Sequence, residues 1–286
     1  MHFEIRYPTP ALQPYITRYV FVRAEGSTDT MVPPDDDPRF VNGKHVQQLL
    51  PNYGSLVFMR NVKADFNGTF SDGLTILGPY RKPVALTTLS GWFEGMLLDF
   101  EPGGLHALLG IDLQQIGDQI LTAAEYGDEG LKQCDQIFKS ATDAEMIANL
   151  IDAFFAGHLP RRENVNYSRL QKAIEACDAL KGDISTSRMA EEACLSERQF
   201  LRIFRQYVGI PPKQFIRLRR FHRTLQHMQK EAAAGHPIDL IHIALCHGYY
   251  DLSHMALEFQ QMGCFTPSHF RMLGIPLTDD FSIFFA

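Results

Sequence analysis

The last third of the chain contains an internal repeat, and this repeat constrains the fold more than any other feature of the sequence. The segment FRQYVGIPPKQF, which begins at Phe204, aligns with FQQMGCFTPSHF, which begins at Phe259. At the same offset of 55 residues, Ser196 corresponds to Asp251, Phe200 to Met255, Pro212 to Pro267 and Phe215 to Phe270. Self-similarity at a fixed period indicates repeated structural units. We therefore expect two copies of one module here.

The first copy has the pattern of two short helices joined by a tight turn. A helix is expected over residues 185–195, with small side chains on the inner face that let a second helix cross closely: Met189, Ala190 and Ala193. Cys194 and Leu195 would form the turn. Ser196 then begins a new helix, because its hydroxyl can accept a hydrogen bond from the backbone N–H of Gln199.

The new helix is strongly amphipathic. Its apolar residues recur at helical spacing, which predicts a buried stripe of Phe200, Ile203, Phe204 and Tyr207. Polar and basic residues are left on the outer face: Arg198, Gln199, Arg202 and Arg205. A short helix, a turn and a second helix with an outward basic face form a helix-turn-helix, whose second helix enters the major groove of DNA.

Charge along the chain supports binding of nucleic acid by this part. The net charge is −6, but residues 1–160 hold 11 Lys/Arg against 20 Asp/Glu, whereas residues 161–275 hold 16 against 11. From position 198 to 230 there is no acidic residue and nine basic ones: Arg198, Arg202, Arg205, Lys213, Arg217, Arg219, Arg220, Arg223 and Lys230. A run of one sign suits neutralisation of phosphates; the alternative is a basic but inert surface.

The sequence predicts an α+β chain of two domains. Short β-rich runs separated by Gly, Pro and Asn turns indicate a barrel or sandwich, cupin-like, in the first hundred residues: 19–22, 48–50, 56–59 and 96–100. Helical periodicity begins near Gly103. We expect a β-rich sensing and dimerisation domain with appended helices at 1–160, a linker at 161–166, an all-α domain of two helix-turn-helix units joined by a long helix at 167–273, and an apolar tail at 274–286.

The C-terminal part resembles the DNA-binding domain of AraC/XylS transcription regulators. The two modules, the long helix between them (residues 213–231) and the closing GYYDLSHMALEFQQMGCFTPSHFR carry the resemblance, which includes Gly248 and Pro267. In that family two recognition helices enter successive segments of the major groove. The resemblance therefore implies sequence-specific binding of double-stranded DNA, and it places Arg198, Leu201 and Arg202 where the first helix contacts bases.

Within this set Arg202 is the strongest candidate, because a guanidinium can pair bidentately with guanine. Arg205, Lys213 and Arg217 are expected to contact phosphate. The second copy departs from the family pattern: Leu252, Ser253 and Leu257 stand at its base-contacting positions, and Leu257 replaces a common arginine. We therefore expect the first module to dominate affinity, and the second to contribute shape and register.

The segment LGPYRKP to IGDQI resembles, more weakly, an N-terminal sensor domain of some family members. The resemblance implies a small-molecule effector of unknown identity, a homodimer, contact with RNA polymerase and a role as an activator.

The tail FSIFFA either docks on the sensor domain or covers the last helix. No basic n-region with an apolar h-region stands at the N-terminus, and no run of about eighteen apolar residues occurs, so we expect a cytoplasmic protein without a membrane span.

No catalytic constellation is recognisable, and we expect no enzyme, no cofactor and no metal. His45 and His106 lack the close His-x-His pairing of a cupin metal site. The five cysteines form no CxxC pair and are expected to be reduced and mostly buried, Cys246 included.

Two alternatives remain open. One is an alkyl-transfer DNA-repair protein, whose N-terminal cysteine cluster has no counterpart before Cys134. The other is a degenerate family member that acts through protein contacts and binds DNA weakly.

Overall fold

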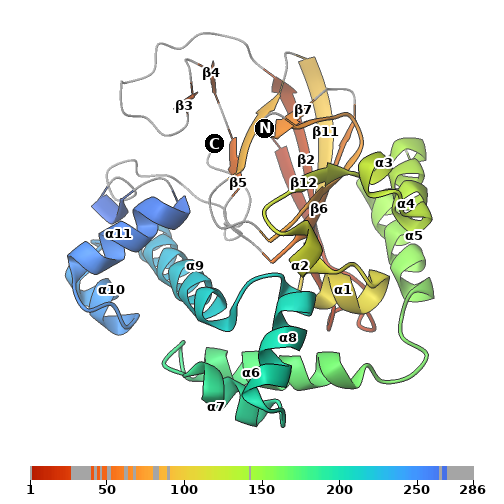
Figure 1. Ribbon diagram of the computed structural model, residues 1–286. Helices are drawn as coiled ribbons and strands as arrows, with labels where there is room; N and C mark the ends of the chain where they lie inside the picture. The colour runs from red at the N-terminus through yellow and green to blue at the C-terminus, as the bar shows by residue number, and fades with distance from the viewer. Residues whose placement is uncertain are drawn as a thin grey trace.

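The computed structural model describes residues 2–26, 40–41, 44–45, 47–49, 53–60, 64–66, 69–79, 84–88, 91–141, 143–263 and 266–268. Strands fill the first part of the chain and helices the second (Figure 1). This arrangement confirms the expected α+β class with a β-rich N-terminal region and a helical C-terminal region. The apolar tail from residue 274, Phe270, Cys264 and the side chain of His45 lie outside the described residues.

The N-terminal region contains two antiparallel sheets and a small hairpin. The larger sheet has the order β1-β2-β11-β6-β9-β12, so that as described it is open, with β1 and β12 at its edges. Its strands are β1 (His2–Arg6), β2 (Ile16–Gly26), β11 (Gly91–Phe100), β6 (Ser55–Arg60), β9 (Leu74–Leu77) and β12 (Ile120–Thr122). The second sheet has the order β5-β10-β7-β8, with β5 (Gln47–Leu49), β10 (Val84–Thr88), β7 (Ala64–Phe66) and β8 (Thr69–Ser71). β3 (Phe40–Val41) pairs with β4 (Lys44–His45).

Helices cover one face of the larger sheet (Figure 1). They are α3 (Ala123–Tyr126), α4 (Glu129–Ser140) and α5 (Ala144–Gly157), whereas α1 (Gly104–Leu109) and α2 (Leu113–Ile116) follow β11 at one end of the sheet. Aromatic contacts join the layers: the rings of Phe58 and Phe138 lie 5.2 Å apart, and those of Phe100 and Phe155 5.7 Å apart. The central strand β6 is buried almost throughout, which is the pattern of a strand covered on both faces.

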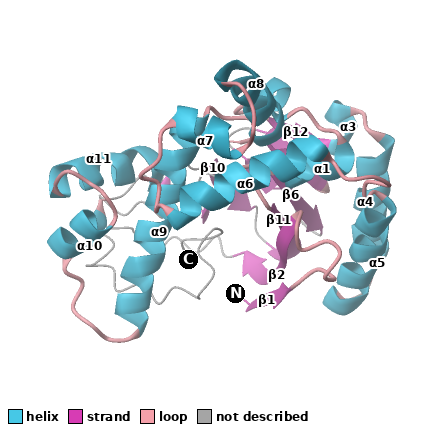
Figure 2. Ribbon diagram, turned by 90° about the horizontal axis from the view of Figure 1, so that it is seen from below, coloured by secondary structure: helices cyan, strands magenta, loops and turns pink. Residues whose placement is uncertain are grey.

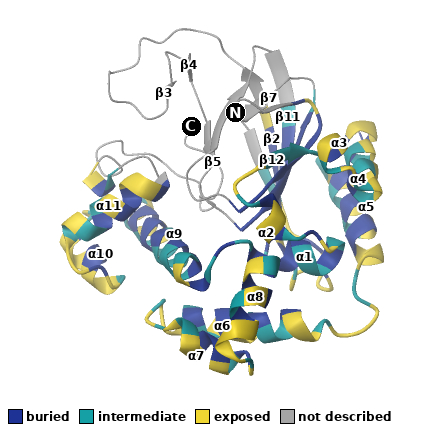
Figure 3. Cartoon of the chain, in the orientation of Figure 1, coloured by how far each residue is buried: buried dark blue, intermediate teal, exposed yellow. Residues whose placement is uncertain are grey.

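The C-terminal region is made of six described helices. They are α6 (Val165–Ala179), α7 (Thr186–Glu192), α8 (Glu197–Val208), α9 (Pro212–Ala233), α10 (Leu240–Cys246) and α11 (Leu252–Gly263). Each presents a buried stripe and an exposed stripe (Figure 3). Figure 2 shows α10 and α11 at the end of the molecule farthest from α4 and α5. None of the described helices is long and apolar enough to cross a lipid bilayer.

The two regions have separate hydrophobic cores, but they are joined by a close contact around α6 and α8. The ring of Tyr15 stacks on that of Tyr167 at 5.0 Å, and the Tyr167 hydroxyl donates to the carbonyl of Pro14 at 2.5 Å. The amide of Gln171 donates to the carbonyl of Pro102 at 3.0 Å. These bonds fix α6 against the start of β2 and the end of β11.

The predicted linker at 161–166 is in part helical. Asn164 caps α6, and its side-chain oxygen accepts from the backbone N–H of Tyr167 at 3.1 Å and from the hydroxyl of Tyr207 at 3.0 Å. The linker therefore ends inside a hydrogen-bonded corner between α6 and α8. The exact domain boundaries stay a prediction.

One residue of the N-terminal region lies inside the helical core. Tyr53, two residues before the start of β6, is 5% exposed, and its ring lies 5.0 Å from that of Phe215 in α9. Burial raises the pKa of its phenol. This side chain links the β-rich region to the long helix.

Substitution of Gly209 tests how much the packing of the two regions contributes to the free energy of unfolding. Its φ is +81°, and an added Cβ would lie 2.2 Å from the Pro79 side chain. Gly235 has a similar φ of +70° with no atom within 4 Å of an added Cβ. Gly235→Ala should cost only the left-handed strain, about 1 kcal/mol. Gly209→Ala should lower the free energy of unfolding by about 2–4 kcal/mol, because overpacking against the N-terminal region is added. Urea unfolding of both variants measures the difference, and equal losses would contradict it.

Candidate nucleic-acid interface

The first helix-turn-helix unit consists of α7 and α8, as the sequence predicts. Met189, Ala190 and Ala193 are buried, and Cys194 occupies the turn with a φ of +53°. Ser196 caps α8: its hydroxyl accepts from the backbone N–H of Gln199 at 3.4 Å. The Gln199 side chain reciprocally accepts from the backbone N–H of Ser196 at 3.2 Å, which completes a capping box.

The two faces of α8 differ as expected. Phe200, Ile203, Phe204 and Tyr207 are at most 6% exposed. Arg198, Arg202 and Arg205 are exposed, whereas Leu201 is half-buried. Among the residues that the structure describes, none of these three arginines forms an ion pair. The outer face of α8 therefore presents exposed guanidinium groups that have no ion-pair partner in the described part of the chain, from its first turns to Arg205 in its last turn.

The opposite end of α8 is attached to the N-terminal region. The ring of Tyr207 lies 4.0 Å from that of His106 in α1. Gly103, at the start of α1, lies against Tyr207, and Gly209 lies against Leu113 of α2. One end of this helix is thus packed while the other is open.

The long basic run is less uniform in space than in sequence. Four of its nine basic residues, all on α9, bind carboxylates from other helices. The Nε of Arg219 donates to Asp178 of α6 at 2.9 Å, and Arg223 lies 3.7 Å from the same carboxylate. Arg217 and Arg220 each lie 2.7 Å from Glu258 of α11. The hydrogen bonds from Arg219 to Asp178 and from Arg217 and Arg220 to Glu258 join residues 38–41 positions apart. Sequence spacing therefore did not indicate the pairs.

This pairing concerns Arg217, which the sequence predicts to contact phosphate. Its Nε donates to Glu258 and its terminal nitrogen donates to Gln261 at 3.1 Å, so the fork of the guanidinium faces α11. Lys213, one turn earlier on α9, is exposed and has no ion-pair partner in the described part of the chain. The cations available to a ligand are therefore concentrated on α8 and at the start of α9.

The second unit consists of α10 and α11 and has a weaker polar face. The side chain of Asp251 accepts from the backbone N–H of His254 at 2.7 Å, at the start of α11. Leu252 is half-buried, Ser253 is exposed and Leu257 is 54% exposed. The outer surface of this unit is more apolar than the sequence led us to expect, with three further exposed apolar side chains: Ile241, Leu245 and Tyr250.

The prediction for the cysteines is partly wrong. Cys134 and Cys177 are buried, but Cys246, predicted to be buried, is exposed, and so is Cys194. The helix α10 turns Ile243 and Ala244 inward, so the residue two positions after Ala244 lies on the outer face, where its sulfur is 3.4 Å from His242 Nε2. The adjacent His247 points inward to His227, at 3.0 Å, and burial lowers its pKa to about 4. His247 is therefore neutral at pH 7 and adds no charge to this surface.

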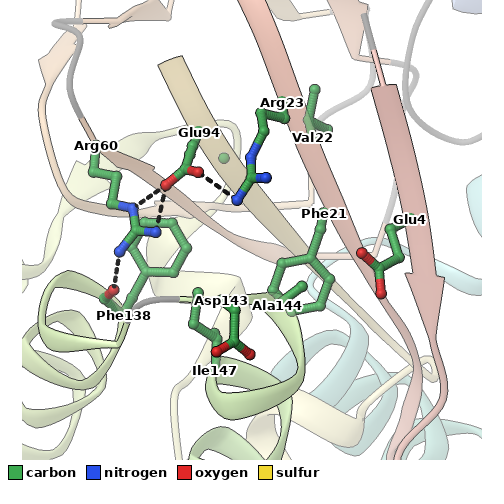
Figure 4. A pocket seen from close by; sticks show the side chains of 11 residues that line it. Glu4, Phe21, Val22, Arg23, Arg60, Glu94, Phe138, Asp143, Ala144 and Ile147 are labelled. Atoms are coloured by element: carbon green, nitrogen blue, oxygen red, sulfur yellow. Dashed lines mark hydrogen bonds and ion pairs between the residues drawn. The ribbon is translucent and has the colours of Figure 1, made fainter. Parts of the chain in front are cut away.

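The N-terminal region contains a pocket of about 160 Å³ between the larger sheet and the α4–α5 turn (Figure 4). Figure 4 shows the carboxylate of Glu94 between two guanidinium groups: Arg60 Nε donates to it at 2.5 Å and Arg23 lies 2.7 Å away. A terminal nitrogen of Arg60 also donates to the carbonyl of Ala141 at 2.5 Å. The apolar wall is formed by Phe21, Phe138, Ala144 and Ile147.

Comparison with known families places the two regions in different groups. Residues 189–272 match a family model described as a helix-turn-helix domain, and residues 5–122 match one described as a domain of unknown function (DUF6597). No curated protein matches the chain.

Solved structures with similarity include ToxT from Vibrio cholerae O395, with 9% identity, coverage of 96% of this chain and 99% of that chain, and a TM-score of 0.48. An AraC-type regulator from Chromobacterium violaceum has 23% identity, covers 39% of this chain and 96% of its own, and has a TM-score of 0.35. The AraC-like activator CuxR has 13% identity, coverage of 77% and 86%, and a TM-score of 0.25.

Replacement of Arg202 tests the ranking of the two units. Arg202→Ala should weaken binding to a selected DNA site by about 1–3 kcal/mol and relax the sequence preference at one position. Arg188→Ala, an exposed arginine on α7 that pairs with Glu191 and Glu192, serves as the control and should change little. Fluorescence anisotropy with labelled duplexes measures both. If Arg202→Ala binds normally while Ser253→Ala abolishes binding, the second unit dominates and the ranking is wrong.

Proposed function

We propose a function from one premise: residues 189–272 form a helix-turn-helix domain of the AraC type. The chain is a sequence-specific, DNA-binding transcription regulator. This proposal is supported above all by which arginines are exposed without an ion-pair partner among the described residues. Arg198, Arg202 and Arg205 are exposed on one face of α8 without carboxylate partners among the described residues, whereas the arginines of α9 are paired.

In this proposal Arg198, Leu201 and Arg202 contact base edges in the major groove. Arg205 and Lys213 contact phosphate. Leu252, Ser253 and Leu257 face a second groove segment, where the leucines would touch thymine methyl groups. Arg217 keeps its place near the DNA, but its hydrogen bonds to Glu258 and Gln261 favour a role in holding α11.

The N-terminal region is proposed to sense a small molecule. The pocket at the α4–α5 turn supports this, because it combines an apolar wall with charged groups at its rim. Its volume of about 160 Å³ lies below the range of roughly 300–1,000 Å³ that is usual for drug-sized ligands, so a compact metabolite is the suitable class. We further propose a cytoplasmic homodimer, assembled through residues 1–160, that activates RNA polymerase.

A second candidate function is regulation through protein contacts with weak DNA binding. The exposed apolar side chains of the second unit, Ile241 at 64%, Leu245 at 62% and Tyr250 at 88% exposed, favour this candidate. An apolar surface on a helical unit is typical of protein contacts.

The salt dependence of DNA binding separates the two candidates. For the proposed regulator, the logarithm of the affinity for its own upstream DNA should fall linearly with the logarithm of the salt concentration. The slope should be about −3 to −5, since roughly 0.9 counterion is released for each phosphate that a cation neutralises and few cations are free. Lys213→Gln should reduce the slope by about 1. A flat response would favour the protein-contact candidate.

Two measurements test the effector pocket: thermal unfolding with a bound metabolite, and the same measurement after a larger side chain has been placed in the pocket wall. A compact metabolite that binds there should raise the midpoint of thermal unfolding of the full chain, because a ligand that binds only the folded state stabilises it. Ala144→Leu, at the pocket wall, should abolish that shift. Ala153→Leu, on the exposed side of the same helix, should preserve it. If Ala144→Leu leaves the shift unchanged, the ligand binds elsewhere.

A further inference from the structure

The second helix-turn-helix unit is held to α9 by a buried carboxylate. Glu258, in the middle of α11, has a side chain that is only 2% exposed. One of its oxygens accepts from Arg217 and from Arg220, both at 2.7 Å, and the other accepts from the Nε of Arg220 at 3.3 Å. Two arginines on one face of α9, three residues apart, therefore converge on a single carboxylate.

The same arginines also contact the turn of this unit. Arg220 donates to the carbonyl of Gly248 at 3.3 Å, and its guanidinium lies 4.7 Å from the centre of the Tyr249 ring. Arg217 reaches Gln261, one turn further along α11. The turn and the helix that follows it are thus bound to one short stretch of α9.

Apolar packing leaves the angle between the two helices variable by about 15–20° around a preferred value. The rings of Phe221 and Phe259 are 4.9 Å apart, and burial of apolar surface is favourable but not directional. A forked guanidinium on a carboxylate is directional. A buried carboxylate that left its partners would be an uncompensated charge, because it has already lost its hydration, so the geometry is firmly held.

The first unit shares the same frame. Phe204 of α8 packs edge-on against Phe215 of α9 at 5.3 Å, and only three residues separate the two helices. Whatever fixes α11 on α9 therefore also fixes α11 relative to α8. Asp178 makes a similar bridge to Arg219 and Arg223, but it connects α9 to α6 and not to α11.

We infer that Glu258 is a positioning residue that sets the spacing and angle between the two recognition helices. It thereby makes the protein selective for the distance between its two DNA segments. This inference rests on the proposed function and assigns a specificity role to a side chain that does not touch DNA. It also explains how a second unit with few polar contact residues can contribute to recognition.

The experiment uses the full-length chain and duplexes selected by it from a pool with a randomised central segment. Footprinting defines the two protected segments, and one or two base pairs are then inserted between them. For the unaltered chain each insertion should weaken binding by roughly tenfold, which corresponds to about 1.4 kcal/mol. For Glu258→Gln the insertion should cost less than about threefold, while the first segment remains protected.

Two further variants make the outcome decisive. Asp178→Asn removes a charge from the other bridge and should lower the unfolding temperature without changing the spacing preference. Arg217→Lys keeps the charge but loses the fork, leaves the Arg220 bond in place, and should relax the preference partly. If Glu258→Gln shows no cooperative unfolding, the spacing preference of Arg217→Lys decides the outcome instead. An unchanged spacing preference in the folded variants overturns the inference, because a purely structural role predicts uniform weakening. If the unaltered chain selects no DNA at all, the proposed function fails and this inference fails with it.

Discussion

The arrangement of the C-terminal region depends on how the positive charge of α9 is neutralised. Four arginines lie along this helix, and their mutual repulsion is relieved by two carboxylates from different helices. Because Asp178 belongs to α6 and Glu258 to α11, neutralisation of α9 also assembles the helices around it. The ion pairs therefore determine which helices meet and which cations remain for a ligand.

The same constraint explains the asymmetry between the two repeated modules. In the first, the recognition helix keeps its arginines on the exposed face, and its far end is packed on α1 and α2. In the second, α11 turns an acidic side chain inward, and the unit as a whole leaves apolar residues outside. One module presents exposed arginines that have no carboxylate partner among the described residues, and the other is fixed to α9 by a buried carboxylate. The repeat preserves a scaffold while the two surfaces differ.

Much of this could be predicted from local sequence. The cap at Ser196, the buried stripe of α8 and the positions of the turns follow from spacing over a few residues, and the structure confirms them. The carboxylates that pair with Arg217 and Arg219 could not be predicted. They lie 41 residues away, and a single sequence does not show which distant carboxylate binds which arginine. The exposure of Cys246 was missed because it depends on which side of a seven-residue helix faces the core. The pocket joins four strands to a helix turn, a combination that only the tertiary fold brings together.

The place of Tyr53 has a consequence for the independence of the two halves. This residue comes from the β-rich half but fills a position in the helical core, against Phe215. Severing the chain between its halves would leave a vacancy beside α9 and a solvent-facing aromatic ring on the other fragment. If the two halves were interchangeable modules, the β-rich half could be exchanged while the helical half is kept. In this protein such an exchange would also have to supply a substitute for one tyrosine, so its two halves are expected to diverge together rather than separately.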